Sequence, residues 1–165
     1  FILVEIEHIE KNLTFARKDH QLTAITDMEF DELGTSFLVK HRNTNNIVAE
    51  AHCFYQTDGG EVPGPTLDIF EIRQEWRGQG YETSLLDAIE YFYRGMFASI
   101  LNTENDVRLY VCNIKSHKVF EWFEERGFRD DDGTGERLSK SLNEEIAAEE
   151  APYITRQCVG RTYSG

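Results

Sequence analysis

The chain has 165 residues, of which 40% are hydrophobic, and a formal net charge of −13. This length fits a single domain with one core, and the apolar runs fall far short of the about 20 residues of a membrane span. The acidic balance, without a lysine or arginine cluster, argues against a nucleic-acid binder. It favours cationic partners through electrostatic steering, while solubility alone explains it equally well.

The three cysteines, Cys53, Cys112 and Cys158, are an odd number without CxxC spacing. Two of them stand in apolar, strand-like runs. We therefore interpret them as small buried hydrophobes of a reducing, cytoplasmic compartment, and expect no disulfide framework and no metal site.

The first 33 residues are mixed and charged. We predict a strand at residues 2–6. One or two short helices should follow, because Leu13 and Ala16, then Leu22 and Ile25, recur at loosely helical spacing.

Two runs rich in β-branched and aromatic residues come next, Thr35–His41 and Ile47–Gln56. The segment between them, Arg42–Asn46, tolerates turn geometry, so the two runs predict a β-hairpin. A glycine- and proline-rich loop ending at Pro65 leads to a short strand at Thr66–Ile72.

A long amphipathic helix is predicted after residue 80 from its apolar stripe. The stripe and its flank comprise Leu85, Leu86, Ile89, Phe92, Tyr93, Met96 and Phe97. Val107–Cys112 predicts a further strand. Strands interleaved with helices indicate a mixed α/β domain.

A second helix is expected from about His117 to Arg126, with Ser116 as its N-cap and Gly127 ending it. Its inward residues should be Val119, Phe120 and Phe123, and Phe128 should begin another short strand. We expect one domain over residues 1–142 and a partly helical or disordered extension over 143–165.

The segment Arg77-Gly78-Gln79-Gly80 lies between a predicted strand and a predicted helix, and this order indicates a functional site. The first N–H groups of a helix are free, and its macrodipole adds about half a positive charge there. Glycines let the backbone approach a phosphate closely. The loop therefore predicts an anion site, although a plain tight turn also fits. The segment is not a P-loop, because no Gly-Lys-Ser/Thr follows it. It is not a dinucleotide fingerprint either, because the pattern G-x-G-x-x-G is incomplete.

Two segments resemble the GNAT superfamily of acyl-CoA-dependent N-acetyltransferases. Residues 77–81, followed by Leu85-Leu86, resemble the acyl-CoA motif Q/R-x-x-G-x-G/A. Residues 116–128 resemble the family's N-x-x-A-x-x-x-Y-x-x-x-G-F segment. The two lie in the family's order with a strand between them, and the likeness extends from Thr35 to about Leu142.

This resemblance implies a mixed, mostly antiparallel sheet splayed between its fourth and fifth strands. It also implies acetyl-CoA as acyl donor, with pantetheine along Asp68–Ile72 and pyrophosphate on the amides of residues 77–83. The acceptor would be a primary amine, either a small cationic amine or a protein amino group, and a homodimer is common in the family. The residues so assigned to the cofactor are Phe70, Glu71, Ile72, Arg77, Gly78, Gln79, Gly80, Tyr81, Glu82, Thr83, Ser116, Val119 and Phe123.

The chain departs from the family pattern at two positions. Glu82 replaces a glycine or alanine, and a carboxylate about 7 Å from a phosphate charge would cost roughly 0.6–2.4 kcal/mol. Phe123 replaces a tyrosine that commonly protonates the leaving thiolate. Other possible proton donors are Tyr81, Tyr91, Tyr93 and Tyr110. These departures keep open a second interpretation, a degenerate domain that binds CoA or a protein partner without transfer. A larger acyl donor is a third.

The reaction needs a neutral amine, and a carboxylate can take the proton directly or through a water. Asp68 and Glu71 are the candidate catalytic bases, although both also fit as solvated strand residues. Strict alternation places them on opposite faces of the strand, and only one would face the acceptor. Glu50 and His52 share one face of the hairpin, where they can line an acceptor pocket or play a structural part.

Overall fold

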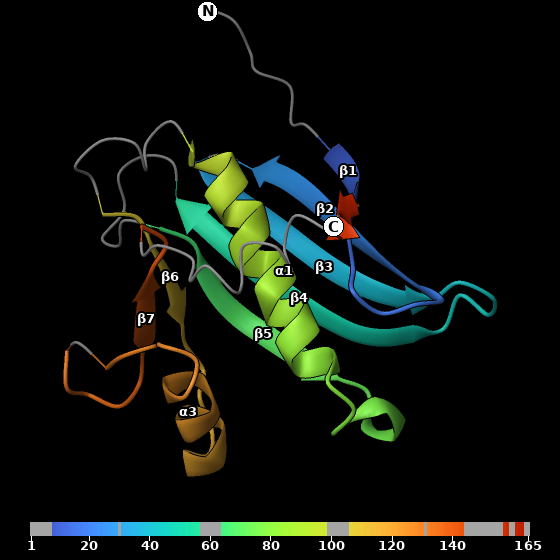
Figure 1. Ribbon diagram of the computed structural model, residues 1–165. Helices are drawn as coiled ribbons and strands as arrows, with labels where there is room; N and C mark the ends of the chain where they lie inside the picture. The colour runs from blue at the N-terminus through green and yellow to red at the C-terminus, as the bar shows by residue number, and fades with distance from the viewer. Residues whose placement is uncertain are drawn as a thin grey trace, which may run out of the picture.

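The structure is a computed structural model that describes residues 8–29, 31–56, 64–98, 106–130, 132–143, 157–158 and 161–163. Its main body is an open seven-stranded sheet in chain order, with one long helix across one face (Figure 1). The strands are β1 (His8–Leu13), β2 (His20–Glu29), β3 (Glu32–His41), β4 (Ile47–Gln56), β5 (Thr66–Ile72), β6 (Arg108–Val111) and β7 (Leu138–Ser141). The helices are η1 (Gln74–Trp76), α1 (Tyr81–Met96) and α3 (His117–Glu124).

The sheet is antiparallel except between β5 and β6. These two strands run parallel and pair only where Thr66 and Leu67 meet Tyr110 and Val111, after which they separate. A mixed, mostly antiparallel sheet with a splay was predicted, and this fold class is confirmed. The splay lies between the fifth and sixth strands of this sheet, because the N-terminal region contributes one strand more than expected.

The predicted N-terminal helices are wrong, since β1 and β2 occupy that part of the chain. In β2 the buried positions His20, Leu22 and Ala24 alternate with half-exposed ones. That is the period of a strand with one face on a core. The strand predicted at residues 2–6 lies outside the described residues.

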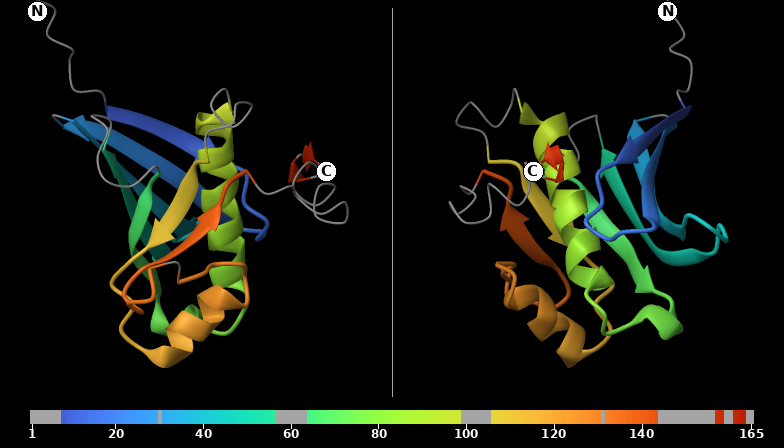
Figure 2. Two further views of the ribbon diagram at one scale, coloured as in Figure 1. Left: turned by 90° about the vertical axis from the view of Figure 1, so that its left-hand side faces the viewer. Right: turned by 45° about the vertical axis from the view of Figure 1, so that its right-hand side comes forward.

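Helix α1 covers the sheet face that carries the core, as Figures 1 and 2 show together. Leu85, Leu86, Ile89 and Tyr93 are at most 2% exposed, and each such side chain contributes about 1.5–3 kcal/mol by leaving water. The predicted stripe is confirmed there. Met96, in the last turn of α1, departs from it, because it is 40% exposed.

The second helix is confirmed together with its ends. The Ser116 hydroxyl accepts a hydrogen bond from the Val119 amide at 3.2 Å, and Gly127 has the positive φ of 97° that favours glycine after a helix. Val119 was expected inward but is 44% exposed. The strand expected at Phe128 is a single bridge from Arg129 to Ser139 of β7, a strand that was not predicted.

The short strands β8 (Gln157–Cys158) and β9 (Arg161–Tyr163) form a separate sheet within the expected C-terminal extension. Apart from Asn143, the rest of that extension lies outside the described residues. Among the helices that the structure describes, none combines the length and apolarity needed to cross a membrane.

Candidate functional site

The separation of β5 and β6 leaves a small cavity of about 80 Å³ between them and α3. Three residues assigned to the cofactor, Phe70, Val119 and Phe123, line it together with Asp68. The Phe70 ring lies 5.8 Å from the ring of Phe123. The complete lining is Leu67, Asp68, Ile69, Phe70, Val111, Cys112, Asn113, Ile114, Val119 and Phe123.

A bulge in β5 decides which way Asp68 points. Across the β4–β5 pair, Cys53 faces Leu67 and His52 faces Ile69, so Asp68 is the extra residue. An extra residue of this kind breaks the period-two alternation of a strand. The predicted alternation is therefore wrong at this position.

The bulge puts both candidate bases on one face of the sheet, the one opposite α1. Residues paired across antiparallel strands share a face. Glu71 pairs with Glu50, and the Asp68 carboxylate contacts the His52 ring. The predicted grouping of Glu50 with His52 is confirmed by the buried alanines that alternate with them.

His52 and Asp68 form a close pair. The distance from His52 Nδ1 to Asp68 Oδ1 is 2.8 Å, and both side chains are about one-quarter to one-third exposed. A carboxylate accepts, so neutral His52 carries its proton on Nδ1 and presents Nε2 as an acceptor. Gly34 makes room for this ring, since a Cβ there would stand 3.3 Å from Nε2.

Glu71 lies apart from the cavity. Arg73 bridges its carboxylate at 3.2 Å and that of Glu50 at 2.8 Å. Glu71 is exposed, and it is absent from the cavity lining, whereas Asp68 belongs to it. The structure thus separates the two candidate bases, and Asp68 is the one beside the opening.

Two glycines of the glycine-rich loop adopt left-handed backbone conformations. Gly78 and Gly80 have φ of 72° and 90°, a conformation open to glycine. The Arg77 and Gln79 side chains fold back onto the preceding backbone, donating to the carbonyls of Ile72 (2.8 Å) and Glu75 (3.0 Å). They hold the loop, and its backbone amides are the groups that could meet a phosphate.

Three residues of the first turn of α1 have specific partners. The Glu82 carboxylate accepts from the Gly78 amide at 3.2 Å. Thr83 Oγ1 accepts from Arg126 at 3.3 Å, which ties α3 to this turn. Tyr81 is 4% exposed, and its hydroxyl lies 3.1 Å from His20 Nε2.

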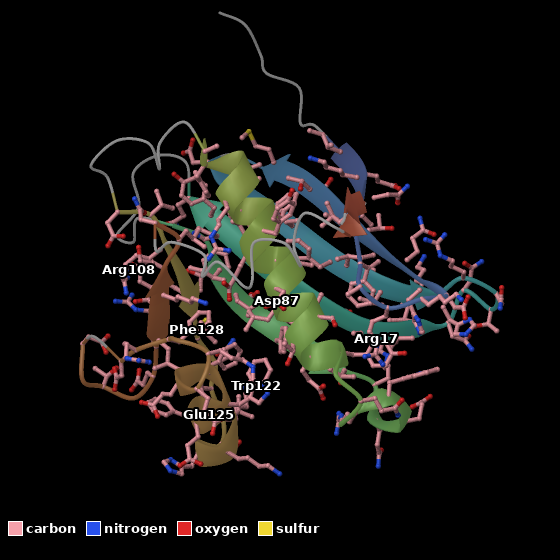
Figure 3. All side chains as sticks on the ribbon, viewed as in Figure 1. Arg17, Asp87, Arg108, Trp122, Glu125 and Phe128 are labelled. Atoms are coloured by element: carbon pink, nitrogen blue, oxygen red, sulfur yellow. The ribbon has the colours of Figure 1, made fainter. Side chains whose placement is uncertain are left out.

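Three residues at this loop were missed by sequence reasoning: Arg17, His20 and Arg126. The Arg17 guanidinium lies 4.3 Å above the Tyr81 ring, beside the start of α1 (Figure 3). Arg17 and His20 come from the region predicted as helices, where no local pattern marks them.

Ser116 lies outside the cavity between β5, β6 and α3, which we call the splay cavity, in a neighbouring shallow hollow at the start of α3. None of the four tyrosines named as proton donors lines the splay cavity as the structure describes it.

Cys112 is a lining residue of the splay cavity. Burial, and next the charge of Asp68, raise the pKa of its thiol, so the thiol is protonated at neutral pH. Among the cysteines whose side chains the structure describes, Cys53 is buried and Cys112 half-buried, and both are free.

No protein-family model matches the sequence, and no curated protein is significantly similar to it. Solved structures similar to it include a GNAT-family acetyltransferase from Staphylococcus aureus Mu50, which is 16% identical with a TM-score of 0.49 over 66% of this chain and 68% of that chain. A mutant AtaT toxin bound to acetyl-CoA and the antitoxin AtaR C-terminus is 16% identical, with a TM-score of 0.48 and coverage of 66% and 68%. A mutant spermidine N-acetyltransferase SpeG from Vibrio cholerae is 19% identical, with a TM-score of 0.45 and coverage of 70% and 69%. Likeness of this size assigns neither activity nor substrate to the chain.

Proposed function

We propose that the protein is an acyl-CoA-dependent N-acyltransferase that moves an acetyl group from acetyl-CoA to a primary amine. One observation carries the proposal: Asp68, which is hydrogen-bonded to His52, lines the cavity between two separating parallel strands. The strand that supplies Asp68 leads through η1 into the glycine-rich loop. The carboxylate that positions the base, an opening for a thioester arm and an anion site therefore follow one another along a short piece of chain.

In the proposed reaction the amine nitrogen attacks the thioester carbonyl, the C–N bond forms and the C–S bond breaks. The proton released from nitrogen passes to His52 Nε2, directly or through a water, and the thiolate of CoA leaves. Asp68 keeps the ring in the required tautomer and stabilises the imidazolium that forms. Deprotonating a lysine-like amine costs about 4–5 kcal/mol at neutral pH, and this is the cost that the pair lowers.

The state of Cys112 favours direct transfer over a covalent acyl-cysteine. A thiolate is the nucleophilic form of cysteine, and the raised pKa keeps Cys112 neutral. Phe123 is 2% exposed and has no proton to give. A CoA thiolate, with an ordinary thiol pKa of about 8.5, can leave without a dedicated acid.

A second function, binding of CoA or of a protein partner without acyl transfer, is favoured by Phe123 and Glu82. The Glu82 carboxylate contacts the Gly78 amide, one of the groups a pyrophosphate would use. The two functions differ in one measurable property, the release of free thiol in the presence of an amine.

The test is acetyl transfer from acetyl-CoA to a panel of primary amines, with thiol release as the readout. We expect His52→Gln and Asp68→Asn to lower kcat by about 10²–10⁴-fold, the usual contribution of a positioned base, with acetyl-CoA affinity unchanged. His117→Gln is the matched control, because His117 is 82% exposed on α3 and contacts the described side chains of Glu121 and Phe120 on its own helix. Full activity in both site variants, or no thiol release by the wild type with any amine, would reject the proposal.

A further inference from the structure

Two opposite charges meet the glycine-rich loop from different parts of the chain. Glu82 comes from the first turn of α1, and Arg17 comes from the segment between β1 and β2. Neither belongs to the residues that hold the loop in shape, which are Arg77 and Gln79.

Glu82 occupies one of the loop's anion-binding groups. Its Oε2 lies 3.2 Å from the Gly78 nitrogen. A carboxylate and a phosphate oxygen are equivalent acceptors for a backbone amide in a left-handed turn. The amide cannot serve both fully, so a bound diphosphate must displace this contact.

Arg17 supplies a cation at the same loop. Its guanidinium rests on the Tyr81 ring, and its Nη1 would be 3.0 Å from a Cβ placed on Gly80. No carboxylate forms an ion pair with Arg17 among the residues that the structure describes. A glycine at residue 80 therefore permits the positive helix end and the arginine to approach the same space.

We propose that Glu82 is an internal anion at this loop and that Arg17 is a phosphate-binding residue, so that a diphosphate binds by replacing the Glu82 carboxylate beside Arg17. The identity of the ligand as acyl-CoA rests on the proposed function. The Glu82 carboxylate then lowers the affinity of the loop for the diphosphate part of the donor, and the Arg17 guanidinium raises it. Neither residue acts on the pantetheine arm, which lies toward β5.

The experiment is calorimetric titration with acetyl-CoA, with S-acetylpantetheine, which has the same thioester arm without phosphates, and with inorganic pyrophosphate. Glu82→Gln keeps the shape of the side chain and removes its charge. We expect it to bind acetyl-CoA about 3- to 60-fold more tightly, the range for one charge about 7 Å away, and to bind pyrophosphate more tightly as well. S-acetylpantetheine affinity should stay within about twofold of the wild type, because that ligand carries no charge for the carboxylate to repel.

Arg17→Gln should weaken acetyl-CoA and pyrophosphate by a similar factor, and Arg17→Lys, which keeps the charge, should retain most of the affinity. Two control variants remove charges of the same signs elsewhere and should have smaller effects. They are Asp87→Asn, in the second turn of α1 (Figure 3), and Lys11→Gln, an exposed residue of β1. Melting temperature and S-acetylpantetheine binding report whether Arg17→Gln is folded.

Equal shifts for acetyl-CoA and S-acetylpantetheine, or no shift in Glu82→Gln, would overturn the inference. If acetyl-CoA binds to no variant, the proposed function fails. The inference then stands or falls on whether pyrophosphate binds more tightly to Glu82→Gln than to the wild type.

Discussion

At the scale of single residues, two histidines show how surroundings decide what a side chain can do. His52 is held by Asp68 at 2.8 Å and packs over Gly34, so one ring nitrogen is fixed as an acceptor. His117 is 82% exposed and meets Glu121 across one helical turn. The same imidazole is a positioned base candidate in one place and a surface group in the other.

Gly34→Ala tests this arrangement without touching the acid–base groups. The new Cβ would stand 3.3 Å from His52 Nε2, closer than an ordinary contact, so the ring must shift. We expect kcat for acetyl transfer to fall by roughly tenfold, since small misplacements of a catalytic group are costly, with acetyl-CoA affinity unchanged.

Gly95→Ala is the control for that measurement, because nothing lies within 4 Å of the added methyl group. It should leave kcat unchanged and stabilise α1 by up to about 1 kcal/mol. A Gly34→Ala variant with wild-type kcat would show that the position of His52 does not matter for the reaction.

At the scale of elements, a buried ion pair joins α1 to β7. Glu90 is 5% exposed in α1, and its Oε1 lies 3.0 Å from Lys140 Nζ and 3.4 Å from Arg94. The helix is therefore anchored on both sides of the splay: its apolar stripe packs on the sheet, and Glu90 contacts the last strand.

Glu90→Gln should lower the free energy of unfolding by about 3 kcal/mol, because it leaves the Lys140 cation, which is only 18% exposed, without its partner charge. Urea unfolding at neutral pH measures this. Glu121→Gln, which breaks an exposed pair with His117, should change the same quantity by less than about 1 kcal/mol. Equal, small effects of the two substitutions would mean that the buried pair does not secure the helix.

At the scale of the whole molecule, the net charge of −13 acts against the proposed donor. CoA is itself a polyanion, so long-range repulsion must be overcome before the loop and Arg17 attract its phosphates locally. Salt screens the long-range term, since the Debye length falls from about 30 Å at 0.01 M to about 8 Å at 0.15 M.

The association rate constant of acetyl-CoA should therefore rise with ionic strength over that range, as measured by stopped-flow fluorescence. S-acetylpantetheine carries no phosphate, and its association rate should stay constant. An acetyl-CoA rate that falls with salt would indicate that a local positive field outweighs the net charge.

Much of the fold follows from local pattern. The sequence predicted the hairpin of β3 and β4, the strand Thr66–Ile72 and the apolar stripe of α1. Strand alternation and the 3.6-residue spacing of a helix can be recognised from residues close together in the chain. The loop at Gly78 and Gly80 was predicted for the same reason. Local pattern did not distinguish helix from strand in the N-terminal region. The spacing of the apolar residues in β2 also fits a loose helix, and pairing with β3 decides for a strand.

The sequence by itself determined the mixed fold class, the glycine-rich loop and the set of candidate groups, since these depend on residues close together in the chain. Tertiary structure alone decided which groups meet. The bulge turned Asp68 toward His52, sixteen residues away, and the packing of β1–β2 against α1 brought Arg17 onto Tyr81. Contacts of this kind depend on register and packing between distant segments, and no local spacing records them.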